Sequence, residues 1–191
     1  STPSFFSQFN LNNSLYRLNK SSLRRIISGG DFFPPSHILE WKNKNKHVSI
    51  FNVWGPTETS IVNSMYKITF NDLSRLKKSE YMPVGISTPE MNIKKISNKK
   101  IIKKPFIDGF VCLEGQSICK GYIGDEKKYR DALIKINNKI YFNTNDIGYF
   151  DASNKIYIKG RGDDTVKLHG YRIDLKEIEI LADSYASIFL S

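Results

Sequence analysis

The feature that most constrains the fold is a change of pattern after the first third of the chain. Leu23–Ile27 is a short apolar segment that ends at Gly29-Gly30, and a second apolar segment covers Val48–Val53. Between them, Pro34-Pro35 precedes a stretch from Ser36 to Lys44 that has the length and proline placement of a helix. Two strands joined by a helix run parallel in one sheet, so this part predicts an α/β segment.

Beyond it, short apolar segments alternate with clusters of Asn, Gly, Pro and Lys. This spacing is typical of β-strands joined by turns, and a barrel or a small sandwich is their simplest packing. The predicted fold class is therefore mixed α/β, with a parallel βαβ segment followed by a β-barrel-like subdomain. The predicted strands are Ile61–Phe70, Met91–Ile96, Gly109–Leu113, Lys139–Asn143 and Lys155–Ile158.

The pattern changes again near the C-terminus. The stretch Asp174–Ala182 predicts a helix with Asp174 as its cap. Its apolar residues fall on one face at helical spacing, namely Leu175, Ile178 and Leu181. Ser184–Ser191 is an apolar segment with no closing element, so we expect a truncation there.

Composition excludes several classes of protein. The formal net charge is +10, but the basic residues form short separate clusters without a zinc-finger or base-stacking pattern, so we predict no nucleic-acid partner. No apolar run is long enough to span a bilayer, and a signal-peptide pattern is missing, so we expect a cytoplasmic protein without membrane insertion. Cys112 and Cys119 lie in apolar stretches that predict strands, which suits buried thiols in a reducing compartment.

The first candidate site is Asn52-Val53-Trp54-Gly55-Pro56-Thr57-Glu58, where the second parallel strand gives way to a turn. Open α/β sheets bind ligands at this edge. The Gly55-Pro56 turn lets the backbone approach a phosphate, Thr57 offers a hydroxyl donor, and Glu58 offers a hard oxygen to Mg²⁺. Trp54 can lie against an adenine ring. The alternative is an ordinary capped turn before a helix.

Two further segments carry polar side chains suited to a nucleotide. Thr144-Asn145-Asp146 follows a predicted strand, and Asp146 at the strand end can accept both hydroxyls of a ribose. Gly160-Arg161-Gly162-Asp163 adds a guanidinium suited to phosphate or ribose oxygens, with glycines that permit unusual backbone angles. A turn aspartate and an exposed hairpin are the respective alternatives.

Taken in order, these segments resemble the adenylate-forming superfamily of acyl-CoA synthetases, luciferases and the adenylation domains of nonribosomal peptide synthetases. Within it, the chain is most similar to amino-acid-activating enzymes, in particular D-alanine:carrier-protein ligases. The superfamily matches are Ser28–Asp31 (family pattern GGE), Asn52–Glu58 (N-x-Y-G-P-T-E), Gly115–Tyr122 (G-x-x-x-x-x-G-Y), Thr144–Asp146 (T-G-D) and Gly160–Glu179 (G-R-x-D-x-x-V-K-x-x-G-x-R-I-x-x-x-E-I-E). The ligase matches are Ser1–Phe5, Met82–Gly85, Gly121–Gly124 and Lys167–Arg172.

The resemblance implies activation of an amino acid, or another small carboxylic acid, as its adenylate, followed by transfer to the phosphopantetheine thiol of an acyl or peptidyl carrier protein. The implied cofactors are ATP or AMP and Mg²⁺. Thr57 and Glu58 are the implied catalytic residues, Glu58 being also the metal ligand. The implied nucleotide-binding residues are Gly29, Gly30, Asp31, Asn52, Trp54, Gly55, Pro56, Asp146 and Arg161. Asp163 is the implied hinge, and the implied acceptor face holds Lys167, Gly170 and Arg172.

The resemblance also implies a domain division. Residues 1–162 correspond to the C-terminal part of a large adenylation domain, with an α/β segment at 1–60 and a barrel-like subdomain at 61–162. Residues 163–191 correspond to the hinge and the beginning of a small domain. The family's phosphate loop and C-terminal lysine have no match, so we expect an incomplete enzyme that is inactive alone.

Two departures from the family pattern bear on function. Asn145 replaces the usual glycine beside Asp146, and asparagine tolerates the left-handed conformation that such a turn needs. A cysteine that lines the substrate pocket of D-alanine ligases aligns with Gly29, so we expect a different or larger acyl group. Two alternatives remain: an acyl-CoA or fatty-acid ligase, and a non-catalytic interaction module that keeps the fold.

Overall fold

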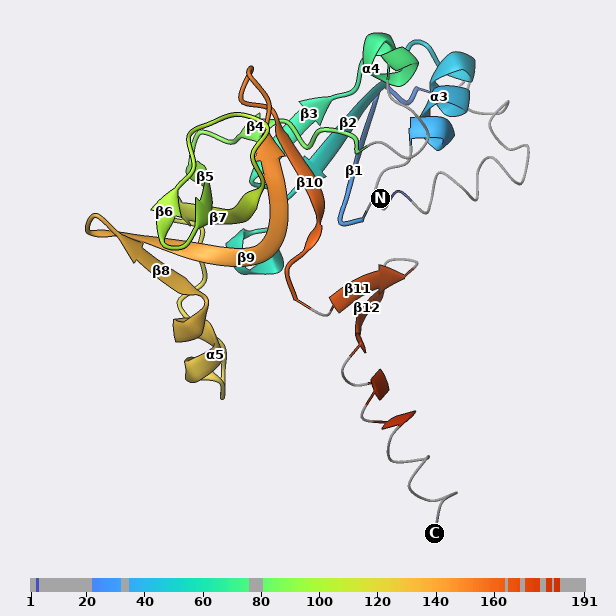
Figure 1. The fold of residues 1–191 in the computed structure, drawn as a ribbon. Coiled ribbons are helices and arrows are strands. Elements are labelled where there is room, and N and C mark those ends of the chain that lie inside the picture. Colours follow the sequence, from blue (N-terminus) through green and yellow to red (C-terminus); the bar gives the residue numbers. More distant parts are fainter. Residues whose placement is uncertain are drawn as a thin grey trace.

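The computed structural model describes residue 3 and residues 22–31, 35–75, 81–163, 165–168, 171–175, 178–179 and 181–182. These residues form a four-stranded sheet, a six-stranded sheet and a two-stranded hairpin (Figure 1). In chain order the elements are β1 (Arg25–Gly29), α3 (Pro35–Lys44), β2 (Ser49–Trp54), the 3₁₀ helix η1 (Thr57–Thr59), β3 (Ser64–Lys67), α4 (Phe70–Arg75), β4 (Ile86–Ser87), β5 (Met91–Ser97), β6 (Lys100–Ile101), β7 (Gly109–Gly115), α5 (Glu126–Asp131), β8 (Leu133–Ile136), β9 (Lys139–Phe150), β10 (Ile156–Arg161), β11 (Thr165–Leu168) and β12 (Tyr171–Asp174).

The four-stranded sheet confirms the predicted βαβ unit. Strands β1 and β2 pair in parallel, from Arg25 opposite Ser49 to Gly29 opposite Val53. Helix α3 connects them and begins at Pro35, where a missing backbone N–H costs no helical hydrogen bond. Strands β3 and β4 then continue the sheet in antiparallel fashion, in the order β1-β2-β3-β4.

One predicted strand in this region is wrong in extent. Strand β3 covers only Ser64–Lys67 of the predicted Ile61–Phe70, and Phe70 is the first residue of α4. The helix begins here because Thr69 and Asp72 cap each other: the Thr69 backbone N–H donates to Asp72 Oδ2 at 2.8 Å, and the Asp72 N–H donates to Thr69 Oγ1 at 3.2 Å. This reciprocal capping outweighs the strand-like pattern of the preceding residues.

Apolar side chains from α3, α4 and the first sheet form one core. Trp41 is 1% exposed and is the largest of them. The cluster also contains Ile38, Val48, Ile50, Ile68, Leu73 and Met82. The two helices therefore cover one face of the four-stranded sheet, as Figure 1 shows for α3 and α4.

The six-stranded sheet is the curved β-sheet expected for the barrel-like subdomain, but it begins at β5 (Met91) and not at residue 61, because β3 and β4 pair into the four-stranded sheet. It is antiparallel, with strand order β10-β9-β7-β5-β6 and β8 attached to β9. Its long strand β9 curves along the sheet in Figure 1. Its core contains Val111, Leu113, Ile93 and Ile156. The architecture is thus mixed α/β with a strongly curved β-sheet, as the sequence predicted.

A short backbone bridge joins the two sheets. The Val84 N–H donates to the Ile156 carbonyl at 2.8 Å, and the Ile156 N–H donates to the Gly85 carbonyl at 2.7 Å. Gly85 has φ +94°, and a Cβ there would lie 1.9 Å from the Met65 carbonyl oxygen. The junction therefore requires glycine for both its backbone angle and its close approach to β3.

The two cysteines differ from one another. Cys112 lies in β7 and is fully buried, as predicted, and burial raises the pKa of its thiol to about 12. Cys119 does not lie in a strand: it follows β7 in a loop and is partly exposed. The strand prediction failed there because β7 ends at Gly115, and the Cys119 N–H bonds to the Glu58 carbonyl at 2.7 Å instead of to a neighbouring strand.

The last described residues form a two-stranded hairpin, and several residues after it are helical. Strands β11 and β12 pair in antiparallel fashion, with Lys167 opposite Arg172. Leu175, Ile178 and Leu181 are helical, as predicted, and their side chains are 40%, 51% and 56% exposed. Asp174, the predicted cap, is the last residue of β12.

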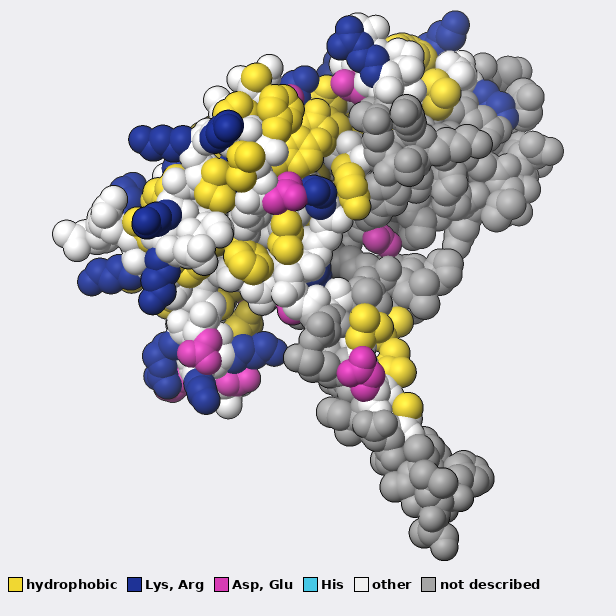
Figure 2. All heavy atoms as spheres, viewed as in Figure 1, with side chains coloured by type: hydrophobic (Ala, Val, Ile, Leu, Met, Phe, Trp, Pro, Cys, Tyr) yellow, Lys and Arg dark blue, Asp and Glu magenta, His cyan; other side chains and the backbone are white. Residues whose placement is uncertain are grey.

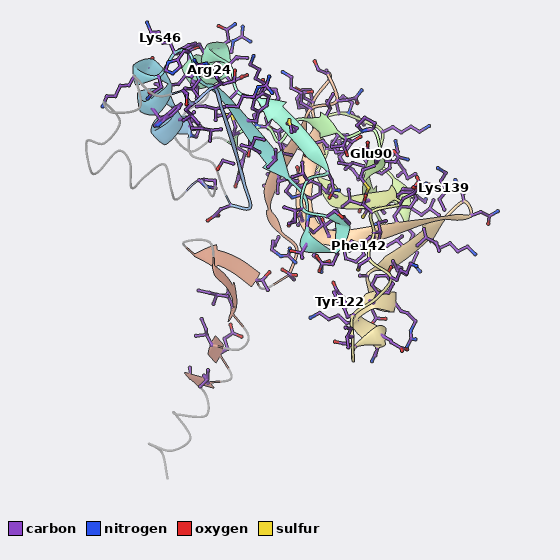
Figure 3. All side chains as sticks on the ribbon, turned by 180° about the vertical axis from the view of Figure 1, so that it is seen from behind. Arg24, Lys46, Glu90, Tyr122, Lys139 and Phe142 are labelled. Atoms are coloured by element: carbon purple, nitrogen blue, oxygen red, sulfur yellow. The ribbon has the colours of Figure 1, made fainter. Side chains whose placement is uncertain are left out.

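Charged side chains are dispersed over the surface. In Figure 2 the Lys and Arg side chains lie in several small groups, mostly toward the edges of the face shown, and hydrophobic side chains gather toward its middle. Lys139, labelled at the tip of the β8–β9 hairpin in Figure 3, pairs with Glu114 at 2.8 Å. None of the helices in the described part of the chain has the length and apolar character needed to cross a bilayer.

Candidate nucleotide site

The segment after β2 forms a tight loop that positions Thr57 and Glu58. The Pro56 carbonyl accepts hydrogen bonds from the N–H groups of Thr59 and Ile61, both at 3.1 Å. A Cβ at Gly55 would lie 2.5 Å from Asn63 Oδ1, so the glycine is required for packing within the protein. Thr57 is exposed and Glu58 is partly buried, and both line the same cavity. The alternative considered from the sequence, a capped turn before a helix, is not what the structure has: the segment is a single 3₁₀ turn without a side-chain cap.

Asp146 lies within a strand and not at a strand end, which corrects the sequence prediction. Strand β9 continues through it to Phe150, because the residues on both sides pair with β7 and β10. Asn145 has φ +60°, so the strand has a left-handed residue next to Asp146. The expectation that asparagine would adopt the conformation of the family's glycine is confirmed.

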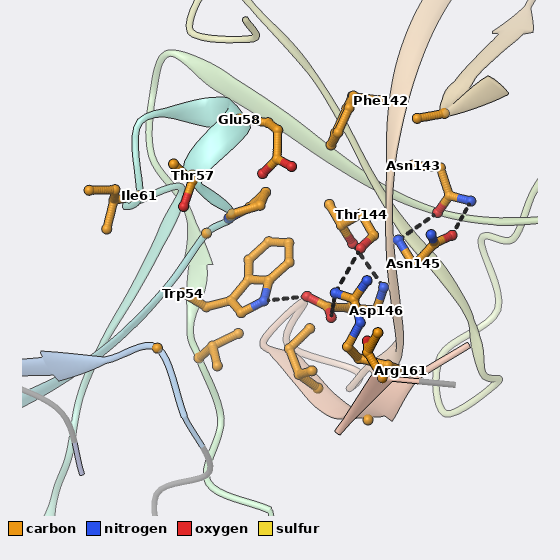
Figure 4. Close-up of a pocket in the computed structure, with 18 of the residues that line it drawn as sticks. Trp54, Thr57, Glu58, Ile61, Phe142, Asn143, Thr144, Asn145, Asp146 and Arg161 are labelled. Carbon is orange, nitrogen blue, oxygen red and sulfur yellow. Dashed lines mark hydrogen bonds and ion pairs between the residues drawn. The ribbon is translucent and has the colours of Figure 1, made fainter. Parts of the chain in front are cut away.

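Two side chains hold the Asp146 carboxylate. The Trp54 indole N–H donates to Oδ2 at 2.8 Å, and Arg161 Nη1 donates to Oδ1 at 3.2 Å (Figure 4). Trp54 and Asp146 are 92 residues apart in the sequence and belong to different sheets.

Arg161 joins Asp146 to Asp163. Its Nε and Nη2 atoms donate to the two carboxylate oxygens of Asp163 at 2.7 and 2.5 Å, in the bidentate geometry that suits a guanidinium. These hydrogen bonds and the attraction of both carboxylates raise the pKa of Arg161. The same hydrogen bonds from Arg161 hold the pKa of Asp163 well below its usual range. The segment is therefore not the exposed hairpin considered from the sequence.

The lowered pKa of the Asp163 carboxylate leads us to predict that the stability of the fold decreases at low pH. Because its folded pKa is lowered, it stabilises the fold above its unfolded pKa of about 3.9, and this contribution is lost as pH falls toward the folded value. We expect the Asp163→Asn variant to lose less stability than the wild type between about pH 4 and pH 2. Melting temperatures measured across this range test the prediction, and parallel acid limbs for the two proteins would contradict it.

The residues described above converge on one cavity of about 1110 Å³ at the junction of the two sheets. This volume slightly exceeds the range of about 300–1,000 Å³ that is usual for small-molecule sites. One wall comes from the β2–η1 segment and the other from β9 and β10, as the close-up in Figure 4 shows. The sequence-predicted residues that line it are Gly30, Asp31, Asn52, Trp54, Gly55, Pro56, Thr57, Glu58, Asp146 and Arg161.

Other predicted residues have different locations. Gly29 does not line this cavity, and a Cβ there would lie 2.2 Å from the Val53 carbonyl oxygen. Asp163 bonds Arg161 but does not itself line the cavity. Lys167 and Arg172 lie opposite each other in the β11–β12 hairpin, and Gly170 lies outside the described residues. Buried Asn52 also has a structural role, because its amide donates to the Pro83 carbonyl at 2.9 Å.

Sequence reasoning missed two residues that organise the site. The Tyr122 hydroxyl donates to Glu58 Oε1 at 2.6 Å. The Thr144 hydroxyl donates to the Val111 carbonyl at 2.7 Å and accepts from the Asp146 N–H at 3.1 Å. Both residues belong to segments that match the family pattern, Gly115–Tyr122 and Thr144–Asp146. Their polar side chains within those segments were the signal that could have identified them as site residues. Their partners could not be known from the sequence because they lie on other strands and loops.

The donor set suits a Mg²⁺ ion that arrives with a nucleotide. Within the described residues no group of three or more His, Cys, Asp or Glu side chains could hold a metal ion. Glu58 provides one carboxylate at the cavity wall. Mg²⁺ commonly binds one or two protein carboxylates together with phosphate oxygens and water, so this single carboxylate fits that mode of binding.

The fold and the site define an α/β protein with a nucleotide-sized cavity between a parallel-containing sheet and a curved antiparallel sheet. The family model described as AMP-binding enzyme matches residues 1–123. The chain therefore belongs to the AMP-binding enzyme family, which confirms the resemblance seen in the sequence.

Curated relatives agree with this assignment. The chain is 33% identical over 152 residues to a D-alanine--D-alanyl carrier protein ligase of Bacillus velezensis, covering 79% of this chain and 29% of the relative. It is 31% identical to the Bacillus licheniformis ligase of the same name, covering 94% of this chain and 35% of the relative. The chain thus spans about a third of the length of these ligases.

Solved structures show the same fold. An NRPS protein containing adenylation and PCP domains superimposes with a TM-score of 0.81 at 24% identity, covering 94% of this chain and 36% of that one. The Vibrio cholerae adenylation domain AlmE, in complex with glycyl-adenosine-5'-phosphate, gives a TM-score of 0.81 at 22% identity, with 94% and 34% coverage. These likenesses establish the fold of the described chain.

Proposed function

We propose that this chain forms the ribose- and metal-facing part of the nucleotide site of an adenylate-forming ligase, which activates a small carboxylic acid with ATP and delivers it to a carrier protein. The observation that carries the proposal is the convergence of Trp54, Asp146 and Arg161 in one hydrogen-bonded group beside Glu58. Membership of the AMP-binding enzyme family and similarity to proteins named as D-alanyl carrier protein ligases support it.

In this proposal each residue has a defined task. Asp146 accepts the ribose hydroxyls, and its orientation is maintained by the donors Trp54 and Arg161. The Trp54 ring then stands where an adenine could lie against it. Thr57 offers its exposed hydroxyl to the phosphates, and Glu58 offers carboxylate oxygen to the metal ion.

The chemistry needs neutralisation of charge more than proton transfer. A substrate carboxylate is ionised at neutral pH, so its attack on the α-phosphorus of ATP needs no general base. The reaction brings two anions together, and a bound Mg²⁺ supplies the Lewis acid that stabilises the developing charge. The protein residues fix the nucleotide in the geometry for attack, which is a large part of such catalysis.

The proposal extends to the second half-reaction. Asp163 is the proposed hinge, and Lys167, Gly170 and Arg172 are the proposed face presented to the phosphopantetheine of the carrier protein. Arg161 bonds both Asp146 and Asp163. A rotation at Asp163 would therefore alter the support of the ribose-binding carboxylate, which links the nucleotide site to the position of the following hairpin.

An amino acid is the proposed acyl group. Gly29 does not line the cavity, and a Cβ there would lie 2.2 Å from the Val53 carbonyl oxygen. The glycine therefore opens no space in the cavity for the larger acyl group expected from the sequence. ATP–pyrophosphate exchange with a panel of D- and L-amino acids, fatty acids and aryl acids would identify the substrate.

Tryptophan fluorescence tests nucleotide binding directly. The chain has two tryptophans; Trp41 is buried in the first core, whereas Trp54 lines the cavity. In a Trp41→Phe background, we expect AMP to change the emission of Trp54 saturably. Replacing Asp146 with alanine should weaken AMP binding at least about tenfold, because hydrogen bonds to a charged group contribute about 1.5–3 kcal/mol each.

Glu114→Ala is the matched control for this titration. Glu114 is a carboxylate that pairs with Lys139 at 2.8 Å, and neither residue lines the cavity, so its removal should leave AMP affinity unchanged. A flat titration of the Trp41→Phe protein, or equal affinities for the Asp146 and Glu114 variants, would refute the nucleotide site.

A further inference from the structure

The carboxylate of Glu58 is held by a second segment of the chain. Glu58 lies in a single 3₁₀ turn of three residues, which by itself does not restrict a glutamate side chain to one rotamer. Tyr122, 64 positions further along the chain, donates its hydroxyl to Glu58 Oε1 at 2.6 Å. In the described part of the chain no side chain donates to Glu58 Oε2.

The segment that carries Tyr122 is also fixed to the Glu58 backbone. The Cys119 N–H donates to the Glu58 carbonyl at 2.7 Å, and the Cys119 carbonyl accepts from the Tyr129 hydroxyl at 2.5 Å. Tyr129 belongs to α5, so Cys119 connects the Glu58 backbone to this helix. The same loop thus holds Glu58 by two hydrogen bonds, one from the Cys119 backbone N–H and one from the Tyr122 hydroxyl.

Aromatic packing fixes the position of the Tyr122 ring. It meets Tyr129 edge-on with centroids 5.9 Å apart, and Tyr129 stacks on Phe142 at 6.3 Å. Phe142 is buried in β9, four residues before Asp146. Figure 3 shows Tyr122 beside α5 with Phe142 nearby on the β9 side. The row of rings therefore connects the strand of the proposed ribose carboxylate to the proposed metal carboxylate.

We propose that Tyr122 is a positioning residue for metal binding: its hydroxyl holds Glu58 in one rotamer so that the carboxylate is ready for the Mg²⁺ that accompanies the nucleotide. This inference rests on the proposed nucleotide site and assigns it a further residue. A pre-oriented carboxylate loses less rotamer entropy when it coordinates the ion. Outer-shell hydrogen bonds of this kind orient the ligands of metal sites in general.

The inference is tested with Mn²⁺ as a spectroscopic substitute for Mg²⁺. Free Mn²⁺ is quantified by its electron paramagnetic resonance signal during titration of the protein with a non-hydrolysable ATP analogue present, and AMP affinity is measured separately without metal. We expect Tyr122→Phe to weaken Mn²⁺ binding about 10- to 100-fold. Its AMP affinity should stay within about twofold of the wild type, because the ring packing is retained.

A double-variant cycle shows whether Tyr122 acts through Glu58. On a Glu58→Gln background, Tyr122→Phe should have no further effect on Mn²⁺ binding, because the group that it positions is gone. Tyr157→Phe removes a phenol that lines no part of the cavity and should bind Mn²⁺ like the wild type.

The outcomes separate the two proposals. Three results would overturn the role of Tyr122 and leave the nucleotide site standing. Tyr122→Phe could bind Mn²⁺ as tightly as the wild type, or it could lose as much affinity for AMP as for Mn²⁺. On the Glu58→Gln background, it could weaken Mn²⁺ binding by as much again as it does in the wild type. Failure of the wild-type chain to bind either AMP or the Mn²⁺–nucleotide complex would overturn both.

Discussion

Arg161→Ala is expected to lose stability by about 2–4 kcal/mol and to bind AMP about 10- to 100-fold more weakly. The change removes the cation that pairs with two carboxylates, Asp146 and Asp163, whose side chains are only 15% and 28% exposed. The cost lies toward the lower part of the range for fully buried ion pairs because water still reaches both groups. Urea denaturation and AMP titration measure the two effects.

Two further arginine variants give this prediction its controls. Arg130 forms a largely exposed pair with Glu126, so Arg130→Ala should change stability by no more than about 0.5 kcal/mol. Arg161→Lys keeps the charge but loses the bidentate geometry toward Asp163, so it should recover only part of the loss. Similar stabilities for the two alanine variants would mean that the Arg161 network contributes nothing to the fold.

Gly85→Ala is expected to destabilise the protein by at least about 3 kcal/mol. Backbone strain at a positive φ costs about 1–3 kcal/mol, and the new methyl group would in addition lie 1.9 Å from the Met65 carbonyl oxygen. Relief of this overlap separates β3 from the bridge that joins the sheets. Because the cavity has one wall on each sheet, nucleotide affinity should fall together with stability.

Gly124→Ala separates the two causes of this loss. Gly124 also has a positive φ, of 79°, but nothing lies within 4 Å of a Cβ built there. It should therefore lose only about 1–2 kcal/mol and keep its nucleotide affinity. If Gly85→Ala is no worse than Gly124→Ala, the close contact with Met65 is not a constraint on the junction.

The residues of the candidate site could be predicted from the sequence, and their roles stay predictions. A strand–turn boundary, a hard oxygen, a carboxylate and a guanidinium suit a nucleotide, and the structure gathers the residues that provide them, Trp54, Glu58, Asp146 and Arg161, at one cavity. The helix Pro35–Lys44 and the parallel pairing of its flanking strands were equally predictable. The helix and the parallel pairing depend on residues that are neighbours in the sequence and on the short connection between the two strands, and the order of residues along the chain specifies both.

Some local predictions failed where a specific contact outweighed the pattern. The Thr69–Asp72 cap converts the end of a predicted strand into α4. Pairing of β9 with strands on both sides carries it through Asp146, where the sequence indicated a strand end. In both cases hydrophobic periodicity could not predict the deciding hydrogen bonds, because it indicates which side chains are buried and not which groups bond to one another.

By itself, the sequence determined the family, the α/β class and the residue types that make the site, because these are properties of order and spacing along one chain. Only the tertiary structure decided which groups hold one another: Tyr122 to Glu58 across 64 positions and Trp54 to Asp146 across 92. Such pairs depend on the register of distant strands and on the junction at Gly85. Strand register is established by packing between segments, and no local pattern encodes it.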